Sequence, residues 1–96
     1  MLNGLLPIGS VVLLEESQKR VMIVGVGQKG VGEQGKLWDY AGVLFPEGFM
    51  AADKLFLFNN EQIEQIFALG YQDCEQLAFK AKLDAAMEKL REEENK

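Results

Sequence analysis

Few residues in this chain of 96 could do chemistry. It has no histidine and one cysteine, Cys74, so mechanisms that need imidazole are excluded and the usual zinc ligand sets cannot be assembled. The serines Ser10 and Ser17 therefore have no histidine that could activate them. A single cysteine also excludes an intramolecular disulfide. We expect no catalytic residue, no metal and no enzymatic activity.

Asp39 is the carboxylate with the most distinctive surroundings, because it lies in a predicted strand between Trp38 and Tyr40. An inward-facing carboxylate beside aromatic rings could serve as a general acid or base. The alternative is a charge on an edge strand that discourages aggregation between sheets. We favour the second interpretation.

The run Gly25-Val26-Gly27-Gln28-Lys29-Gly30 matches the pattern GxGxxG and follows a predicted strand. Dinucleotide binding by this pattern requires a helix whose N-terminus faces the pyrophosphate. The next residues, 31–35, are a poor helix start and precede another strand. We interpret the Gly-rich segment 25–36 as a mobile loop, or a distorted hairpin, on the surface, and expect no cofactor. A small-ligand or nucleotide-binding regulatory module that uses this loop stays an alternative.

The first two thirds of the chain are typical of strands, over residues 8–58. Short apolar, β-branched or aromatic runs are separated by turn residues, and the first two runs predict an antiparallel hairpin. Because both faces of the second run are apolar, we expect it to be a central strand covered on each side. The predicted strands are Ile8–Glu15, Arg20–Val26, Leu37–Phe45 and Leu55–Phe58.

The last third predicts two helices. Asn59 suits an N-cap with Gln62 at the capping-box position, and Gly70 suits the C-terminal end of a short helix over 59–69. Asp73 suits a second N-cap, for a helix over 73–92 that leaves a frayed tail at 93–96. The sequence thus predicts one α+β domain over 1–96. We expect a small antiparallel sheet, or a partly open barrel, followed by these helices.

Charge and hydropathy restrict the partners. Fifteen acidic against ten basic residues give a net charge of −5, which argues against a nucleic acid or an anionic membrane surface. No apolar run approaches the roughly 18 residues that a membrane span needs. There is no basic segment followed by an apolar one of the secretory type. We therefore expect a cytoplasmic protein without membrane insertion.

An apolar stripe on the C-terminal helix is the best candidate for function. Its members follow one another at helical spacing, and the remaining positions are mostly charged. The stripe could pack entirely on the sheet, or the helix could extend past the sheet and leave its later turns for a partner. An aromatic face of the sheet could add to that surface. The candidate partner-binding residues are Phe79, Leu83, Met87 and Leu90 of the stripe, which also holds Ala86, and Trp38 and Tyr40 of the sheet.

Several short runs, in their order along the chain, resemble the domain-of-unknown-function family 4176 (DUF4176). The resemblance implies a small cytoplasmic protein of Gram-positive bacteria, encoded beside type VII secretion genes and the LXG-type toxins that those systems export. It implies an accessory role and no established catalytic residues. The runs are Leu6–Leu13, Val21–Gly25, Asp39–Val43, Pro46–Gly48, Phe58–Asn59 and Gly70–Tyr71.

From the residues and the resemblance together, we hypothesise a non-enzymatic adaptor, targeting factor or chaperone. Its partner would be the helical domain of a secreted toxin, held by the C-terminal helix. An immunity or antitoxin protein that neutralises a toxin's active domain is the main alternative. The sequence leaves a homodimer open.

Overall fold

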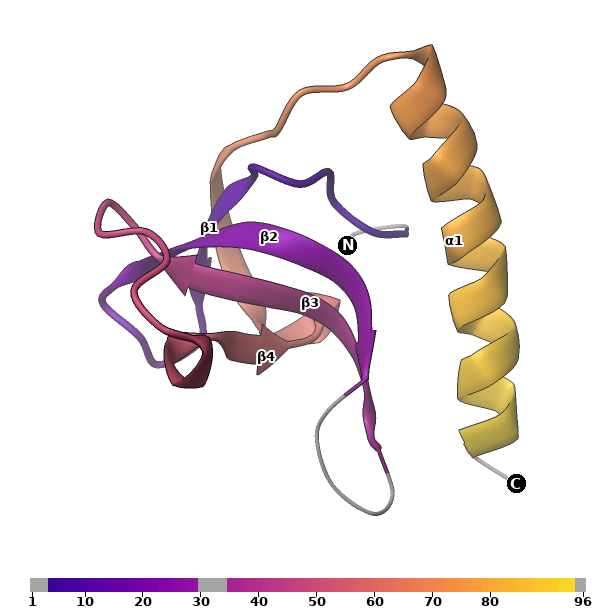
Figure 1. The fold of residues 1–96 in the computed structure, drawn as a ribbon, viewed down its shortest axis with the longest axis horizontal. Coiled ribbons are helices and arrows are strands. Elements are labelled where there is room, and N and C mark those ends of the chain that lie inside the picture. The colour runs from indigo at the N-terminus through magenta and orange to yellow at the C-terminus, as the bar shows by residue number, and fades with distance from the viewer. Residues whose placement is uncertain (1–3, 30–34, 95–96) are drawn as a thin grey trace.

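The computed structural model describes residues 4–29 and 35–94, which form an α+β domain with an open, five-stranded antiparallel sheet (Figure 1). The strand order is β4-β3-β2-β1-β5. The sheet does not close into a barrel, so β4 and β5 are its two edges. The elements are β1 (Val11–Leu14), β2 (Arg20–Lys29), β3 (Leu37–Leu44), β4 (Phe56–Phe58), β5 (Ile63–Ala68) and α1 (Cys74–Glu94), with 3-10 turns at Ala52–Lys54 and Asn60–Gln62.

The predicted hairpin is confirmed, because β1 and β2 pair antiparallel with Val12 opposite Val21. Val21 and Ile23 are buried, and β2 is the middle strand of the sheet as expected. The expectation that both faces of β2 are covered was wrong at Val24, whose side chain is 38% exposed.

The Gly-rich segment is not all loop. β2 continues through Lys29, and its last residues pair with the start of β3, as in Gln28 opposite Trp38. A register shift between Ile23 and Gly25 lets the strand bend and continue, as bulges do. The distorted hairpin is therefore confirmed for residues 25–29 and the loop alternative is wrong there. Residues 30–34 lie outside the described part of the chain.

The short helix predicted over 59–69 is instead a single 3-10 turn followed by strand β5. Gln62 does accept a hydrogen bond from the Asn59 backbone N–H at 2.8 Å, but the Asn59 carboxamide oxygen accepts from the N–H of Asp39. β5 pairs along the outer edge of β1, with Val12 opposite Ile66. This pairing satisfies backbone groups that β1 would otherwise leave unpaired, and it overrides the local helix signals.

The chain that leaves β5 crosses the N-terminal segment, residues 4–10, at very close range. A Cβ on Gly70 would lie 1.9 Å from the carbonyl oxygen of Ile8, so only glycine fits here. Ser10 is fully buried at this crossing. Its hydroxyl donates to the carbonyl of Pro7 at 2.7 Å and accepts from the N–H of Gly70 at 3.0 Å. The crossing fixes the direction in which the chain runs on to α1.

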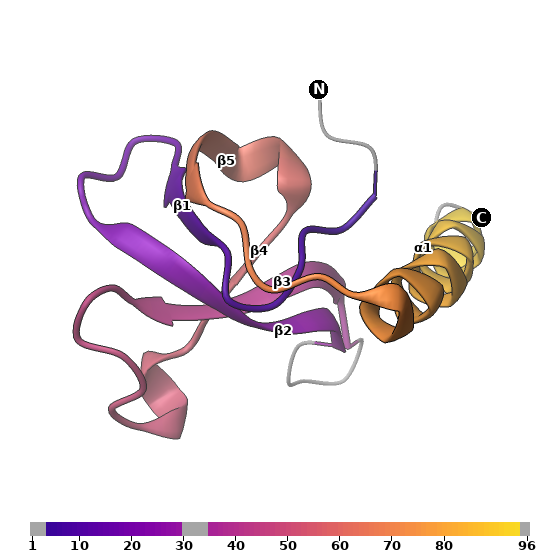
Figure 2. The ribbon, with the colours of Figure 1, turned by 90° about the horizontal axis from the view of Figure 1, so that it is seen from above.

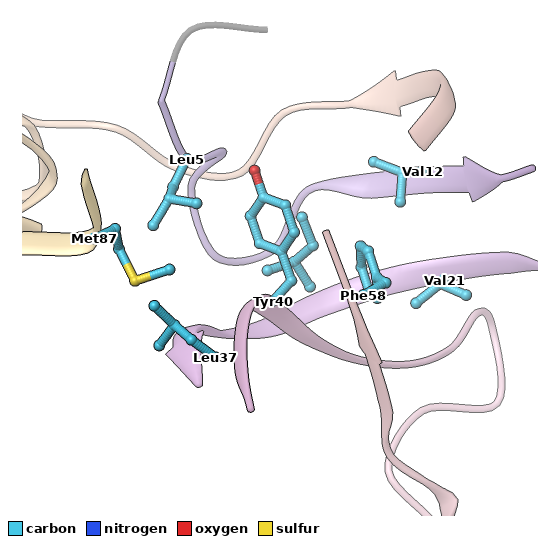
Figure 3. Packing of buried hydrophobic residues seen from close by; sticks show 8 residues of the cluster. Leu5, Val12, Val21, Leu37, Tyr40, Phe58 and Met87 are labelled. Atoms are coloured by element: carbon cyan, nitrogen blue, oxygen red, sulfur yellow. The ribbon is translucent and has the colours of Figure 1, made fainter. Parts of the chain in front are cut away.

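The core lies between the twisted sheet, the N-terminal segment and one side chain of α1 (Figure 3). Tyr40 and Phe58 are its largest members, with ring centroids 5.3 Å apart. Large buried aromatic rings contribute much of the stability of so small a domain. The buried cluster comprises Leu5, Val12, Val21, Ile23, Leu37, Tyr40, Phe58 and Met87.

α1 lies beside the sheet and does not cross its face, as the views of Figures 1 and 2 both show. Its side chains meet the N-terminal segment and the end of the β2–β3 hairpin, and most of its surface is exposed. The expected C-terminal helix is thus confirmed, with bounds Cys74–Glu94. No helix in residues 4–29 and 35–94 is long and apolar enough to cross a membrane.

Candidate docking groove beside the C-terminal helix

α1 begins where the sequence predicts, because the Asp73 carboxylate accepts a hydrogen bond from the N–H of Gln76 at 2.8 Å. Such a cap satisfies one of the free N–H groups of the first turn. Further along, at Met87, the helix makes its main apolar contact with the body, the name used here for the sheet together with the N-terminal segment 4–10. There Met87 points into the space between Leu5 and Leu37 and is 6% exposed (Figure 3).

Met87 is therefore a core residue, and its prediction as a partner-binding residue was wrong for this structure. Its flexible side chain fills the gap between the helix and the sheet, a use to which methionine is well suited. Leu83, one turn earlier, packs against the same cluster and is half-buried. A Cβ on Gly27 would lie 3.0 Å from Leu83 Cδ1. Glycine at the end of β2 thus lets α1 approach the hairpin closely.

A set of hydrogen bonds between polar side chains attaches the last turns of α1 to β3 and to the turn after β4. Arg91 Nη2 donates to Asp39 Oδ1 at 3.0 Å and to Asn59 Oδ1 at 2.9 Å. Asp39 Oδ2 also accepts from the N–H of Asn60 at 2.9 Å. Asp39 lies on β3, an interior strand, so its interpretation as an edge-strand charge was wrong. Its carboxylate joins three segments that are far apart in the sequence.

Tyr40, predicted as part of a partner-binding face, is instead completely buried. Its hydroxyl accepts from the N–H of Leu6 at 2.8 Å and donates to the side-chain oxygen of Asn60. Burial is the main reason why the pKa of Tyr40 is raised to about 12, and the nearby carboxylates of Asp39 and Asp84 add to it. The apolar ring belongs to the core, and its polar end is satisfied within the protein.

A polar hollow of about 490 Å³ lies between α1 and the N-terminal segment. Four of its charged groups form two pairs: Lys80 pairs with Asp84 at 2.6 Å, and Arg91 pairs with Asp39. Asp84 Oδ1 also accepts from the N–H of Leu5 at 3.0 Å. These contacts join the helix to the rest of the domain, and Glu88 is the charged lining residue outside the two pairs.

An apolar groove runs along the first half of α1, next to the N-terminal segment. Its volume is about 110 Å³, and several of its walls are open to solvent, with Ile8 54%, Tyr71 79% and Phe79 54% exposed. This groove is named the docking groove below. Its lining residues are Leu5, Leu6, Pro7, Ile8, Val26, Tyr71, Gln76, Phe79, Lys80 and Leu83.

The docking groove contains a polar group that lacks a hydrogen-bond partner. Gln76 Oε1 is buried and accepts no hydrogen bond from the described residues. Buried polar atoms in native proteins are nearly always paired. Gln76 Oε1 is enclosed by the groove wall and is not exposed to an incoming molecule, so it adds no polar contact for a partner.

Of the remaining candidate residues, Phe79 and Leu90 are exposed on α1, Leu90 by 38%. Phe79 lines the groove, and Leu90 continues the same stripe towards the C-terminus. Trp38 is half-buried at the hairpin end, with Lys36 Nζ 4.5 Å from its ring centroid. The structure thus brings Phe79 and Leu83 together at the groove and assigns Met87 and Tyr40 to the core.

The groove wall at Leu5–Ile8 was not predicted from the sequence. The sequence feature that could have indicated this wall is the apolar run of four residues before the first strand. Such a run by itself does not indicate which element it packs against. The contact of Arg91 with Asp39 spans 52 residues, and no local pattern marks it.

The nucleotide-loop hypothesis finds no structural support in the described part of the chain. Gly25–Lys29 belongs to β2, and the next described element is the strand β3. The described residues on either side of 30–34 form strands, so none of them supplies the helix N-terminus that would face a phosphate. Within residues 4–29 and 35–94, no three His, Cys, Asp or Glu side chains cluster so that they could hold a metal.

A scan against protein families matches residues 5–79 to a domain of unknown function, DUF4176. The chain belongs to the DUF4176 family. The match extends a few residues beyond the runs that suggest the family in the sequence. No curated protein and no solved structure matches the chain.

The DUF4176 match covers the whole sheet, the crossing at Gly70 and the first turns of α1. All groove-lining residues except Lys80 and Leu83 lie within it. The later part of α1, with Met87, Leu90 and Arg91, lies beyond it. The family region therefore includes most of the docking groove, whereas the contacts that hold the second half of α1 lie outside the match.

Proposed function

We propose that this DUF4176 protein is a non-enzymatic adaptor that binds an amphipathic helix of another polypeptide along α1 and its docking groove. The partner that the family resemblance suggests is the helical domain of an LXG-type toxin exported by a type VII secretion system. The protein would keep this domain competent for export or present it to the secretion machinery.

One observation carries the proposal: the apolar stripe of α1 is only partly used by the fold. Met87 is buried and Leu83 half-buried, whereas Phe79 and Leu90 remain exposed beside an apolar groove. Large exposed apolar side chains that gather in one place are typical of interaction sites. A helix laid into an apolar groove is a common mode of recognition.

The groove also fits a peptide better than a small charged ligand. Its walls are mostly apolar side chains, with Gln76 and Lys80 among them. Lys80 borders the groove but is paired with Asp84, and the pair of Arg91 with Asp39 lies outside the groove, near the second half of α1. The apolar groove is thus available for binding, whereas the paired polar residues attach α1 to the sheet and the N-terminal segment.

Co-purification of the toxin's helical domain with the Phe79→Asp variant tests the proposal. A charge in the apolar contact should reduce capture at least tenfold, because a buried, unpaired carboxylate is costly. Leu77→Asp is the matched control, since Leu77 is 53% exposed on the same helix but lies about 200° away from Phe79 around its axis. Circular dichroism should show that both variants stay folded.

Equal capture by Phe79→Asp and Leu77→Asp would contradict the proposal. The immunity alternative predicts a different partner segment. Capture of the toxin's C-terminal catalytic domain, and not of its helical domain, would favour that alternative.

A further inference from the structure

We infer that the helix bound along α1 carries acidic side chains, about one heptad apart, facing Lys82 and Lys89. This inference rests on the proposed function and names the chemistry of the partner. It follows from the charges that border the exposed part of the stripe on its solvent side.

The exposed stripe has the spacing of a coiled-coil seam. Phe79, Leu83, Ala86 and Leu90 follow at intervals of four, three and four residues. Intervals of this kind keep apolar side chains on one line along a helix and let a second helix pack alongside. Met87 lies on the body side of this line and fixes which flank stays open.

The open flank of the stripe carries two lysines without partners. Lys82 and Lys89, seven residues apart, are both exposed, and neither makes an ion pair with the described residues. Lys82 has alanines four residues away on either side, Ala78 and Ala86, so no acid on its own helix face can reach it. Lys89 has the acids Glu92 and Glu93 one turn further along, but neither makes an ion pair with it.

The two ends of the same flank carry acids, Glu75 and Glu93. The positive stretch is thus confined to the middle turns of α1, where Ala86 leaves room for a close approach. In helix pairs, charges that flank the apolar seam decide which partner and which orientation are accepted. A partner helix with acidic residues opposite Lys82 and Lys89 is the complementary one.

The same charges count against a second copy of this chain. In an antiparallel pair that aligns Phe79 with Leu90 of the other copy, Lys82 would face Lys89 twice. Like charges at such positions destabilise the pair. A different, acidic helix avoids this repulsion.

Two synthetic helical peptides with the same leucine seam test the inference, one flanked by glutamates and the other by lysines. Binding to the full-length protein is measured by fluorescence anisotropy at low salt. The glutamate peptide should bind about tenfold more tightly, and the double variant Lys82→Glu with Lys89→Glu should reverse the preference. The preference should shrink as salt is raised. Lys19→Glu with Lys54→Glu, two lysines outside both α1 and the hairpin end that α1 meets, is the control and should leave the preference unchanged.

The inference is overturned if the lysine peptide binds as well as the glutamate peptide, or if neither binds. A stable dimer of the free protein that Phe79→Asp dissociates would also overturn it, because a second copy would then cover the stripe. Toxin capture that depends on Phe79 but not on the two lysines would overturn this inference alone. Peptide discrimination without toxin capture would instead remove the toxin as the partner and leave the preference for an acidic helix intact.

Discussion

Tyr40 shows how one residue serves the fold at both of its ends. Its ring packs against Phe58 in the core, and its hydroxyl binds the Leu6 backbone and the Asn60 side chain. Ionisation of this phenol would place a negative charge among buried groups and near the carboxylate of Asp39. The neutral form is therefore strongly favoured in the folded protein, which raises the pKa of Tyr40 to about 12.

This pKa predicts a loss of stability at high pH. Between about pH 10 and pH 12 the unfolded chain releases the Tyr40 proton before the folded protein does, so the free energy of unfolding falls as pH rises. Below about pH 10 both states keep the proton and Tyr40 adds no pH dependence. The variant Tyr40→Phe lacks this contribution. Its stability deficit relative to the wild type should therefore shrink between pH 9 and pH 11, as measured by urea unfolding. A deficit that stays constant over this range would contradict the assignment.

At the scale of elements, the joint between α1 and the sheet decides where the helix lies. Apolar contact comes from Met87, with Leu83 at its side, and polar contact comes from Arg91 on Asp39 and Asn59. The side chains of Arg91 and Asp39 are 32% and 16% exposed. Such partly exposed pairs contribute modestly to stability but fix geometry through their hydrogen bonds.

Arg91→Ala should therefore loosen the end of α1 more than it destabilises the whole fold. We expect a loss of about 1 kcal/mol in the free energy of unfolding, with faster amide exchange confined to the last turns of the helix. Hydrogen exchange with mass spectrometry resolves this difference. Lys19→Ala, which breaks the exposed pair with Glu47, is the control and should change neither quantity measurably. Uniformly faster exchange across the sheet in Arg91→Ala would refute this local role.

For the whole molecule, the body and the helix are two unequal parts. The sheet and the N-terminal segment supply seven of the eight buried cluster residues, and α1 supplies only Met87. Most of the stability of a helix in a protein comes from tertiary packing of its apolar face rather than from its own propensity. The helix thus depends on the body far more than the body depends on the helix.

Met87→Asp should separate the two parts. A carboxylate at this position cannot stay buried between Leu5 and Leu37, so α1 should detach from the body. Amides of β1, β2 and β3 should stay protected from exchange. Small-angle scattering should show a larger radius of gyration than the wild type, whose Cα atoms give 13.3 Å. The helical circular dichroism should fall because the freed helix frays. Leu77→Asp is the control for both signals, and complete unfolding of Met87→Asp would show instead that the core needs the helix.

The sequence by itself determined the fold class, the first hairpin, the central place of β2 and the start of α1 at Asp73. These features depend on local patterns, namely alternating apolar residues, turn residues and a capping side chain. The resemblance to DUF4176 was also visible in short runs of residues.

Only the tertiary structure decided three other features. Residues 63–68 became a strand because the outer edge of β1 needs hydrogen-bond partners, which no local propensity reports. Tyr40 and Met87 went to the core, and Phe79 and Leu90 stayed outside, because the position of α1 depends on the crossing at Gly70 and on the contact of Arg91 with Asp39. Those contacts join residues dozens of positions apart, so the division of the stripe between core and surface is a property of the assembled fold.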